Sequence, residues 1–152
     1  MKNNVLIITQ SSPTGLNSRQ ASECANVIGF SKHDIHVFID PEKPCEKCIN
    51  NADKIIMIVP EWNGSFPWTF KKMIDDSGWP SRFEGKNVFL IGTSNTTFGN
   101  IVGINHLAEI LNWVGATVVE KVCVPRIQEK FANDDIVVDE RLNNAILAFA
   151  DC

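Results

Sequence analysis

The sequence predicts an α/β protein with a doubly wound, five-stranded parallel sheet between two layers of helices, in an α/β/α arrangement. Its 152 residues are the length of one domain, so we expect residues 1–152 to form a single unit. Segments with strand and helix character alternate five times along the chain. The strand segments are continuous apolar runs, which is typical of parallel strands covered on both faces. For five such strands the leading order is 2-1-3-4-5, with the switch point between strands 1 and 3.

The five expected strands are runs rich in valine, isoleucine, leucine and phenylalanine that stop at polar or turn-forming residues. They cover residues 5–9, 35–39, 55–59, 87–91 and 118–124. Right-handed crossovers keep these strands parallel, so their carboxyl ends meet at one edge of the sheet. The loops after strands 1, 3 and 4 are therefore expected to converge.

The expected helices are segments in which apolar residues recur three or four positions apart. Phe70, Met73 and Ile74 have this spacing and are expected to face the sheet. The helices cover residues 17–28, 67–76, 104–114 and 135–149, with a short polar helix or loop over 40–51 and a loop over 128–133. Trp79 and Trp113 lie beside helix ends and are expected to cover the core or an oligomer contact.

Composition excludes several classes of function. Apolar residues make up 44% and charged residues 21% of the chain, which indicates a folded protein rather than a disordered one. The net charge is −4 and the basic residues are scattered, so no nucleic acid partner is expected. No apolar run approaches the roughly 20 residues of a membrane helix, and the chain enters a strand without a signal peptide. We expect a cytoplasmic protein without membrane contact.

The five cysteines favour reduced thiols, because their number is odd and their density is low. Cys45 and Cys48 have a C-x-x-C spacing, which would suit half a zinc site, a redox dithiol or two thiols that simply coexist on an exposed loop. No second cysteine pair or histidine pair completes a metal set. No metal site is therefore predicted, and His33, His36 and His106 are expected on the surface or in packing.

The polar loop after the first strand has the composition of a phosphate site. It offers hydroxyl groups and an amide beside the free N–H groups of a helix N-terminus, which suit a phosphate monoester. These side chains are Ser11, Ser12, Thr14, Asn17 and Ser18. The alternative is an ordinary strand-to-helix turn capped by serine or threonine. The loop is neither a G-x-G-x-x-G fingerprint nor a Walker A loop, because the paired glycines and the lysine are missing.

The loops after the third and fourth strands suit the edge of a planar heterocycle. Asn63-Gly64 supports a tight turn with positive φ, which lets main-chain groups approach a ring edge-on, and Trp62 could flank the ring. The candidate binding residues in these loops are Pro60, Glu61, Trp62, Asn63, Gly64, Ser94, Asn95, Thr96, Phe98 and Gly99. Glu61 could touch the ring or anchor its own loop.

One stretch carries a specific resemblance. Pro60-Glu61-Trp62-Asn63-Gly64-Ser65-x-Pro67, followed by Phe70-Lys71-x-x-Ile74-Asp75, resembles the P-E-Y-N-G-S-x-P-x-x-L-K-x-x-I-D signature of the NAD(P)H-dependent FMN reductase family. Gly85-Lys86, Ser94 and residues 107–119 also fall where that family has similar residues, so the resemblance spans nearly the whole chain. It implies the flavodoxin-like fold.

The resemblance also implies a cofactor and a reaction. FMN would place its phosphate in the first loop, the pyrimidine edge of its ring at residues 60–64 and its far side at residues 94–99. NADPH or NADH would be the co-substrate, and a small-molecule electron acceptor such as a quinone, azo compound, metal ion, free flavin or oxygen would complete the turnover. Because the flavin carries the chemistry, no catalytic side chain is named. A homodimer or homotetramer is implied as well.

Three departures from the family pattern bear on these expectations. The family's first loop reads G-S-x-R-x-x-S, whereas this chain has Gln10, Ser11, Ser12 and Pro13 and lacks the arginine. Loss of that phosphate partner would weaken FMN binding by roughly 1.5–3 kcal/mol, so we expect FMN to bind, but loosely enough to be lost on purification. Trp62 replaces the tyrosine, and the segment between strands 2 and 3 is short.

Two alternatives remain at this stage. The chain could be a flavodoxin-like electron carrier that binds FMN without nicotinamide activity, although such carriers tend to be more acidic. It could also be a family member that has lost flavin and serves as a binding or structural module. Retention of Asn63-Gly64 and of the hydroxyl-rich loop argues against the last reading.

Overall fold

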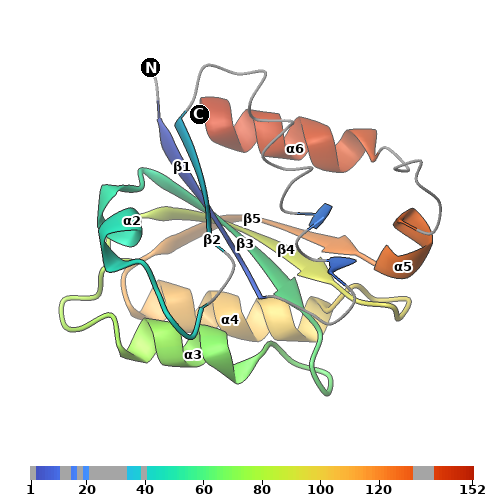
Figure 1. The fold of residues 1–152 in the computed structure, drawn as a ribbon, viewed down its shortest axis with the longest axis horizontal. Coiled ribbons are helices and arrows are strands. Elements are labelled where there is room, and N and C mark those ends of the chain that lie inside the picture. Colours follow the sequence, from blue (N-terminus) through green and yellow to red (C-terminus); the bar gives the residue numbers. More distant parts are fainter. Residues whose placement is uncertain (1–2, 11–14, 17–18, 21–33, 39–40, 132–138) are drawn as a thin grey trace.

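The computed structural model describes residues 3–10, 15–16, 19–20, 34–38, 41–131 and 139–152 (Figure 1). Its sheet has the order β2-β1-β3-β4-β5, and every neighbouring pair is parallel. The strands are β1 (Asn4–Thr9), β2 (Asp34–Phe38), β3 (Lys54–Pro60), β4 (Asn87–Thr93) and β5 (Thr117–Val124). The parallel α/β class predicted from the continuous apolar runs is confirmed.

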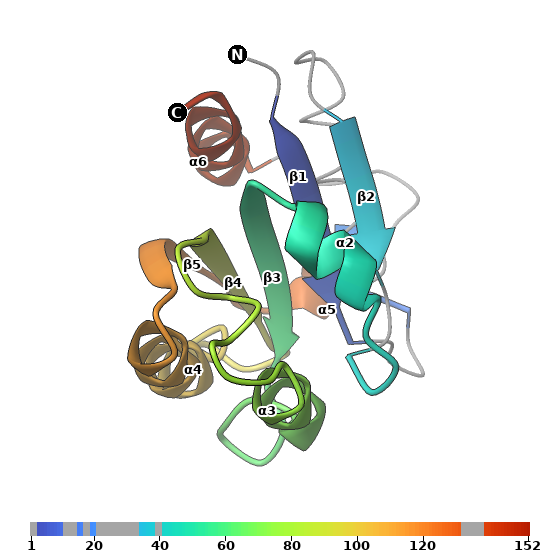
Figure 2. The same ribbon diagram turned by 90° about the vertical axis from the view of Figure 1, so that its left-hand side faces the viewer.

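Helices cover both faces of this sheet (Figures 1 and 2). The described helices are α2 (Glu46–Asn51), α3 (Trp68–Asp75), α4 (Ile101–Trp113), α5 (Ile127–Lys130) and α6 (Glu140–Asp151). α3 and α4 lie side by side under one face, and α6 lies over the other. Residues of α2 pack in the same cluster as residues of α3 and α4, whereas residues of α5 pack with those of α6.

Alternation along the strands divides the core into two clusters. On β3, Ile55, Met57 and Val59 face the α3 and α4 side, whereas Ile56 and Ile58 face the α6 side. All five are fully buried, which explains why the sequence of this strand is uniformly apolar rather than alternating. Phe70, Met73 and Ile74 of α3 are buried against the sheet, as their spacing predicts.

The structure corrects the expected loop over residues 128–133. A short helix, α5, occupies residues 127–130. It follows Arg126, whose φ of 50° turns the chain sharply, and it is anchored by Ile127, which is 4% exposed. The sequence signal is weak because a four-residue helix is too short to show periodicity.

Other boundaries shift by a few residues. The last helix begins at Glu140, where the Asp139 carboxylate accepts the Leu142 N–H at 3.0 Å, and the preceding residues 132–138 lie outside the described part. The expected helix over 17–28 also lies outside it, except at residues 19–20, which are helical.

Trp79 and Trp113 are 82% and 84% exposed, so neither covers the core. Within the described ranges, every helix is too short or too polar to cross a membrane.

The expectation of reduced thiols is wrong for one pair. Cys45 and Cys48 form a disulfide, with Cα atoms 5.2 Å apart, whereas Cys123 and Cys152 are free. Cys45 is the N-cap of α2, and the first helical turn brings residue 48 back over it. This local geometry, which cysteine counting does not reveal, allows the bond to form.

Candidate functional site

The loops after β3 and β4 begin side by side at one edge of the sheet (Figure 1). Pro60 pairs with Thr93 in the register of the two strands. The Glu61 N–H donates to the Thr93 carbonyl at 2.9 Å, and the Thr96 hydroxyl donates to the Glu61 carboxylate at 3.2 Å. Glu61 therefore joins the two loops, a role broader than the expected anchoring of its own loop.

The loop after β1 starts from the same edge, because β1 and β3 are neighbours in register. Its predicted phosphate-binding side chains lie outside the described residues; these are Ser11, Ser12, Thr14, Asn17 and Ser18. At the base of the loop, the Thr69 hydroxyl of α3 donates to the Gln10 side-chain oxygen at 2.6 Å. This contact ties the start of the first loop to the helix that follows the second.

Residues 62–65 form a tight turn of the type I′ kind. The N–H groups and carbonyls of Trp62 and Ser65 exchange hydrogen bonds of 2.9 and 3.0 Å, and φ is 50° at Asn63 and 76° at Gly64. A type I′ turn needs positive φ at both central residues, which is why Asn-Gly is its preferred sequence. Both central residues are exposed, and in the described part of the chain their backbone N–H groups make no hydrogen bond. The turn thus presents two free donors.

Gly64→Ala is expected to lower the free energy of unfolding by about 1–2 kcal/mol, the cost of the left-handed conformation for a residue with a Cβ. No heavy atom lies within 4 Å of the added Cβ, so a steric clash adds nothing to this cost. Urea denaturation measures the change, and Asn63→Gly is the matched control, expected to stay within about 0.5 kcal/mol. Unchanged stability of Gly64→Ala would contradict the positive φ at this position.

Side chains of the loop after β4 are partly used within the protein. The Ser94 and Thr96 hydroxyls lie 2.7 Å apart, and Ser94 Oγ accepts the Thr96 N–H at 3.1 Å. The Asn95 side-chain oxygen accepts the Gln128 N–H of α5 at 3.2 Å. Phe98 differs, because its side chain is 71% exposed. Of the predicted residues here, Ser94 and Asn95 shape the loop, whereas Phe98 is free to meet a ligand.

Gly99 lets this loop lie directly on β5. A Cβ at Gly99 would come within 2.8 Å of the Cys123 Cβ and 2.9 Å of the Val124 and Pro125 nitrogens, and φ is already +59°. The absence of a side chain at Gly99 therefore relieves crowding against β5. Burial raises the pKa of the Cys123 thiol, against the opposing effect of Lys121, so this cysteine is protonated at neutral pH and is a poor nucleophile.

Asn100 is a positioning residue that the sequence reasoning missed. It is 2% exposed, its amide donates to the Val59 and Pro60 carbonyls at 3.1 and 3.0 Å, and its oxygen accepts the Gly103 N–H at 3.2 Å. The same side chain therefore caps α4 and holds the start of the loop after β3. An asparagine directly before a helical pattern, next to a glycine, is a capping signal that could have identified it.

A pocket of about 290 Å³ lies between these two loops and the start of α4. Its lining residues are Glu61, Gly64, Thr96, Phe98, Asn100, Ile101 and Val102. The wall is mainly apolar, with one carboxylate, and exposed Phe98 and Val102 belong to it. Trp62, which is 41% exposed, belongs to the adjacent turn. A pocket of this size and lining suits part of a planar organic ligand.

Comparisons with known proteins agree with this architecture. The sequence profile of the family described as NADPH-dependent FMN reductase matches residues 27–129, about two thirds of the chain. The matched part includes the 62–65 turn and the loop after β4, and it excludes the loop after β1. No curated protein matched the sequence.

Solved structures share the fold at low sequence identity. The flavoenzyme NAD(P)H:(acceptor) oxidoreductase FerB from Paracoccus denitrificans is 22% identical, with a TM-score of 0.76 over 98% of this chain and 93% of that chain. An apo NADH:FMN oxidoreductase, EmoB, is 19% identical, with a TM-score of 0.76 over 98% and 89%. Oxidised flavodoxin 1 from Bacillus cereus is 23% identical, with a TM-score of 0.64 over 97% and 95%. These likenesses show the flavodoxin-like fold.

The family match, over more than half of the chain, decides the assignment. It covers the two loops whose geometry is described above and agrees with the fold of the solved structures. The chain belongs to the NADPH-dependent FMN reductase family and is an FMN reductase-like oxidoreductase with FMN as cofactor.

Proposed function

We propose that this protein passes electrons from NADPH or NADH, through FMN bound between the loops after β1, β3 and β4, to a small acceptor. The observation that carries the placement is the type I′ turn at residues 62–65, whose two central residues are exposed with free N–H donors, and one of which, Gly64, lines the pocket. The acceptor would be a flavin, a quinone, an azo compound or a molecule of similar chemistry.

The described residues fit the ring of FMN. The pyrimidine edge of the ring carries oxygen and nitrogen acceptors, which match the free N–H groups of Asn63 and Gly64. Trp62 and Phe98 offer exposed aromatic surface for the planar ring, and such contacts are favourable in offset or edge-on geometry. Glu61 and Thr96, hydrogen-bonded to each other, would fix the spacing of the two loops around it.

The phosphate end of FMN is assigned to Ser11, Ser12, Thr14, Asn17 and Ser18 from the sequence pattern alone. Hydroxyl groups and helix N–H groups would bind the phosphate without the family's arginine. FMN affinity is therefore expected to be lower than with that arginine by roughly 1.5–3 kcal/mol.

Bound FMN would supply a two-electron acceptor for a hydride, so the side chains need only bind, orient and exclude water. The 62–65 turn would hold the ring edge, and Phe98 and Val102 would keep water from its face. Asn100 would keep the turn in place through the Val59 and Pro60 carbonyls.

Anaerobic mixing of the FMN-loaded protein with NADPH, and separately with NADH, tests the reaction. We expect the flavin absorbance to bleach with one or both nucleotides and to recover when a quinone or oxygen is added. Bleaching by dithionite but by neither nucleotide would contradict the proposal and favour the electron-carrier alternative. A protein that does not bind FMN would contradict both.

A homodimer or homotetramer and a cytoplasmic location belong to the same proposal. Trp68, Trp79 and Trp113 are 54%, 82% and 84% exposed, and tryptophan is enriched at protein–protein interfaces. Light scattering coupled to size-exclusion chromatography would give the mass of the assembly. A monomer at all concentrations would contradict the oligomer.

A further inference from the structure

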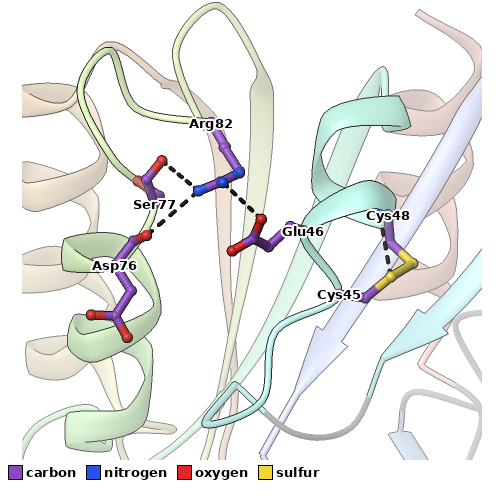
Figure 3. Close-up of polar contacts among 6 residues, drawn as sticks. All are labelled: Cys45, Glu46, Cys48, Asp76, Ser77 and Arg82. Carbon is purple, nitrogen blue, oxygen red and sulfur yellow. Dashed lines mark hydrogen bonds and ion pairs between the residues drawn. A yellow bond between two sulfur atoms is a disulfide. The ribbon is translucent and has the colours of Figure 1, made fainter.

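The C-x-x-C motif forms a closed ring at the start of α2 (Figure 3). Cys45 and Cys48 are joined by a disulfide, and the Cys45 sulfur accepts the Cys48 N–H at 3.3 Å. Neither residue lines the pocket between the loops. We propose that this pair is a redox-active site, a dithiol–disulfide couple that exchanges two electrons with a dithiol reductant.

Other contacts hold α2 in place, so the disulfide is not needed to form the helix. Ile49 is 2% exposed and packs in the core cluster under the sheet. The Lys86 ammonium donates to the Asn50 and Ala52 carbonyls at 3.2 and 2.8 Å, closing the other end of the helix. A disulfide that spans so few residues also removes little entropy from the unfolded chain. The disulfide therefore contributes little to stability, and we assign it a role in thiol–disulfide exchange.

Arg82 joins the start of α2 to the segment after α3 through contacts that do not involve the S–S bond. Glu46, the residue after Cys45, forms an ion pair with Arg82 at 2.8 Å. The same guanidinium donates to the Ser77 carbonyl at 2.8 Å and to the Asp76 carbonyl at 3.5 Å, at the end of α3 (Figure 3). If the backbone and these Arg82 contacts do not change on reduction, the Cys45 and Cys48 thiols stay close enough to re-form the bond.

The two sulfurs differ in their surroundings, which sets the direction of exchange. Cys48 packs against the core cluster, whereas Cys45 is the N-cap at the loop end of α2, where Lys43 and Lys47 are balanced in the sequence by Glu42 and Glu46. The packing of Cys48 against the core favours attack at Cys45, and the Cys48 N–H can stabilise the Cys45 thiolate that the second step releases.

Two successive thiol–disulfide exchange steps reduce the pair. A thiolate of the reductant attacks the Cys45 sulfur, the S–S bond breaks, and Cys48 leaves as a thiolate that takes up a proton. The second thiol of the reductant then attacks the mixed disulfide and releases Cys45. The protein gains two electrons and two protons, and the reductant becomes a disulfide.

Thiol mapping of the wild-type FMN-loaded protein tests reversibility. The folded protein is incubated with excess dithiothreitol without denaturant, quenched with acid, alkylated and mapped by peptide mass spectrometry. We expect Cys45 and Cys48 to become alkylated together, far-UV circular dichroism to stay unchanged, and oxidised dithiothreitol to restore the bond. Reduction only after addition of denaturant would overturn the proposal.

Two single variants test the direction of attack. In Cys48→Ser, Cys45 is left to react with the disulfide 5,5′-dithiobis(2-nitrobenzoate), and in Cys45→Ser, Cys48 is left. We expect the mixed disulfide to form on Cys45 at least tenfold faster than on Cys48. Cys152→Ser, which removes an exposed free thiol, is the control and should leave reduction of the pair unchanged. Equal rates, or faster reaction at Cys48, would overturn the assignment of Cys45.

Discussion

Asn100→Ala is expected to lower the free energy of unfolding by about 2–4 kcal/mol and to weaken FMN binding. The substitution removes the N-cap of α4, worth about 1 kcal/mol. It also removes the amide that donates to the Val59 and Pro60 carbonyls, and Asn100 is only 2% exposed. A buried polar group left without its partner costs about 1–3 kcal/mol. Alanine at a φ of 62° adds strain. Because Pro60 leads into the 62–65 turn, the lost contact would also loosen the proposed FMN site.

Urea denaturation and FMN titration of the same samples measure both effects. Asn105→Ala is the matched control, since Asn105 is exposed on the same helix and its side chain accepts a hydrogen bond from the exposed Lys121 ammonium at 2.6 Å. It should change stability by no more than about 0.5 kcal/mol. Equal effects of the two substitutions would show that the buried contacts of Asn100 do not hold the loop.

Gly103→Ala is expected to destabilise the protein by about 1–3 kcal/mol, although alanine is the better helix former by about 1 kcal/mol. The added Cβ would lie 2.2 Å from the Asn100 side-chain oxygen and 2.7 Å from the Ser65 backbone carbon. The Asn100 cap and the 62–65 turn must both shift, and the cost of that shift exceeds the gain in propensity. FMN affinity is expected to fall on the order of tenfold, because the turn is displaced.

Glu109→Ala, an exposed position on the same helix, separates the helix effect from the contact. It should be neutral within about 0.5 kcal/mol or slightly stabilising. A Gly103→Ala protein that is more stable than wild type and binds FMN normally would contradict the close approach of α4 to the turn.

Much of the fold could be predicted because its signals are local. Buried parallel strands leave continuous apolar runs, and a helix face leaves Phe70, Met73 and Ile74 at helical spacing. The turn at Asn63-Gly64 was predictable because few residues accept positive φ, and the structure has it at both positions.

The rest depends on contacts between distant segments. Gly103 looks like an ordinary helical glycine until Ser65, 38 positions earlier, is placed against it. Asn100 carries a capping signal, but its bonds to Val59 and Pro60 exist only once β3 and α4 meet. The disulfide follows from the first turn of α2, whereas the odd number and low density of the cysteines wrongly favoured reduced thiols. Gly103 and Asn100 position the candidate site, but their contacts cannot be predicted from the local sequence pattern.

The most direct test of the proposed site is an FMN titration of wild type, Phe98→Ala and Trp113→Ala, followed by quenching of flavin fluorescence. Phe98 and Trp113 are similarly exposed, at 71% and 84%, but only Phe98 lines the pocket. We expect wild type to bind FMN, Phe98→Ala to bind about 2- to 13-fold more weakly, the equivalent of about 0.5–1.5 kcal/mol for an aromatic contact, and Trp113→Ala to match wild type. Absence of binding, or an equal loss in both variants, would contradict an FMN ring held between the 62–65 turn and the loop after β4.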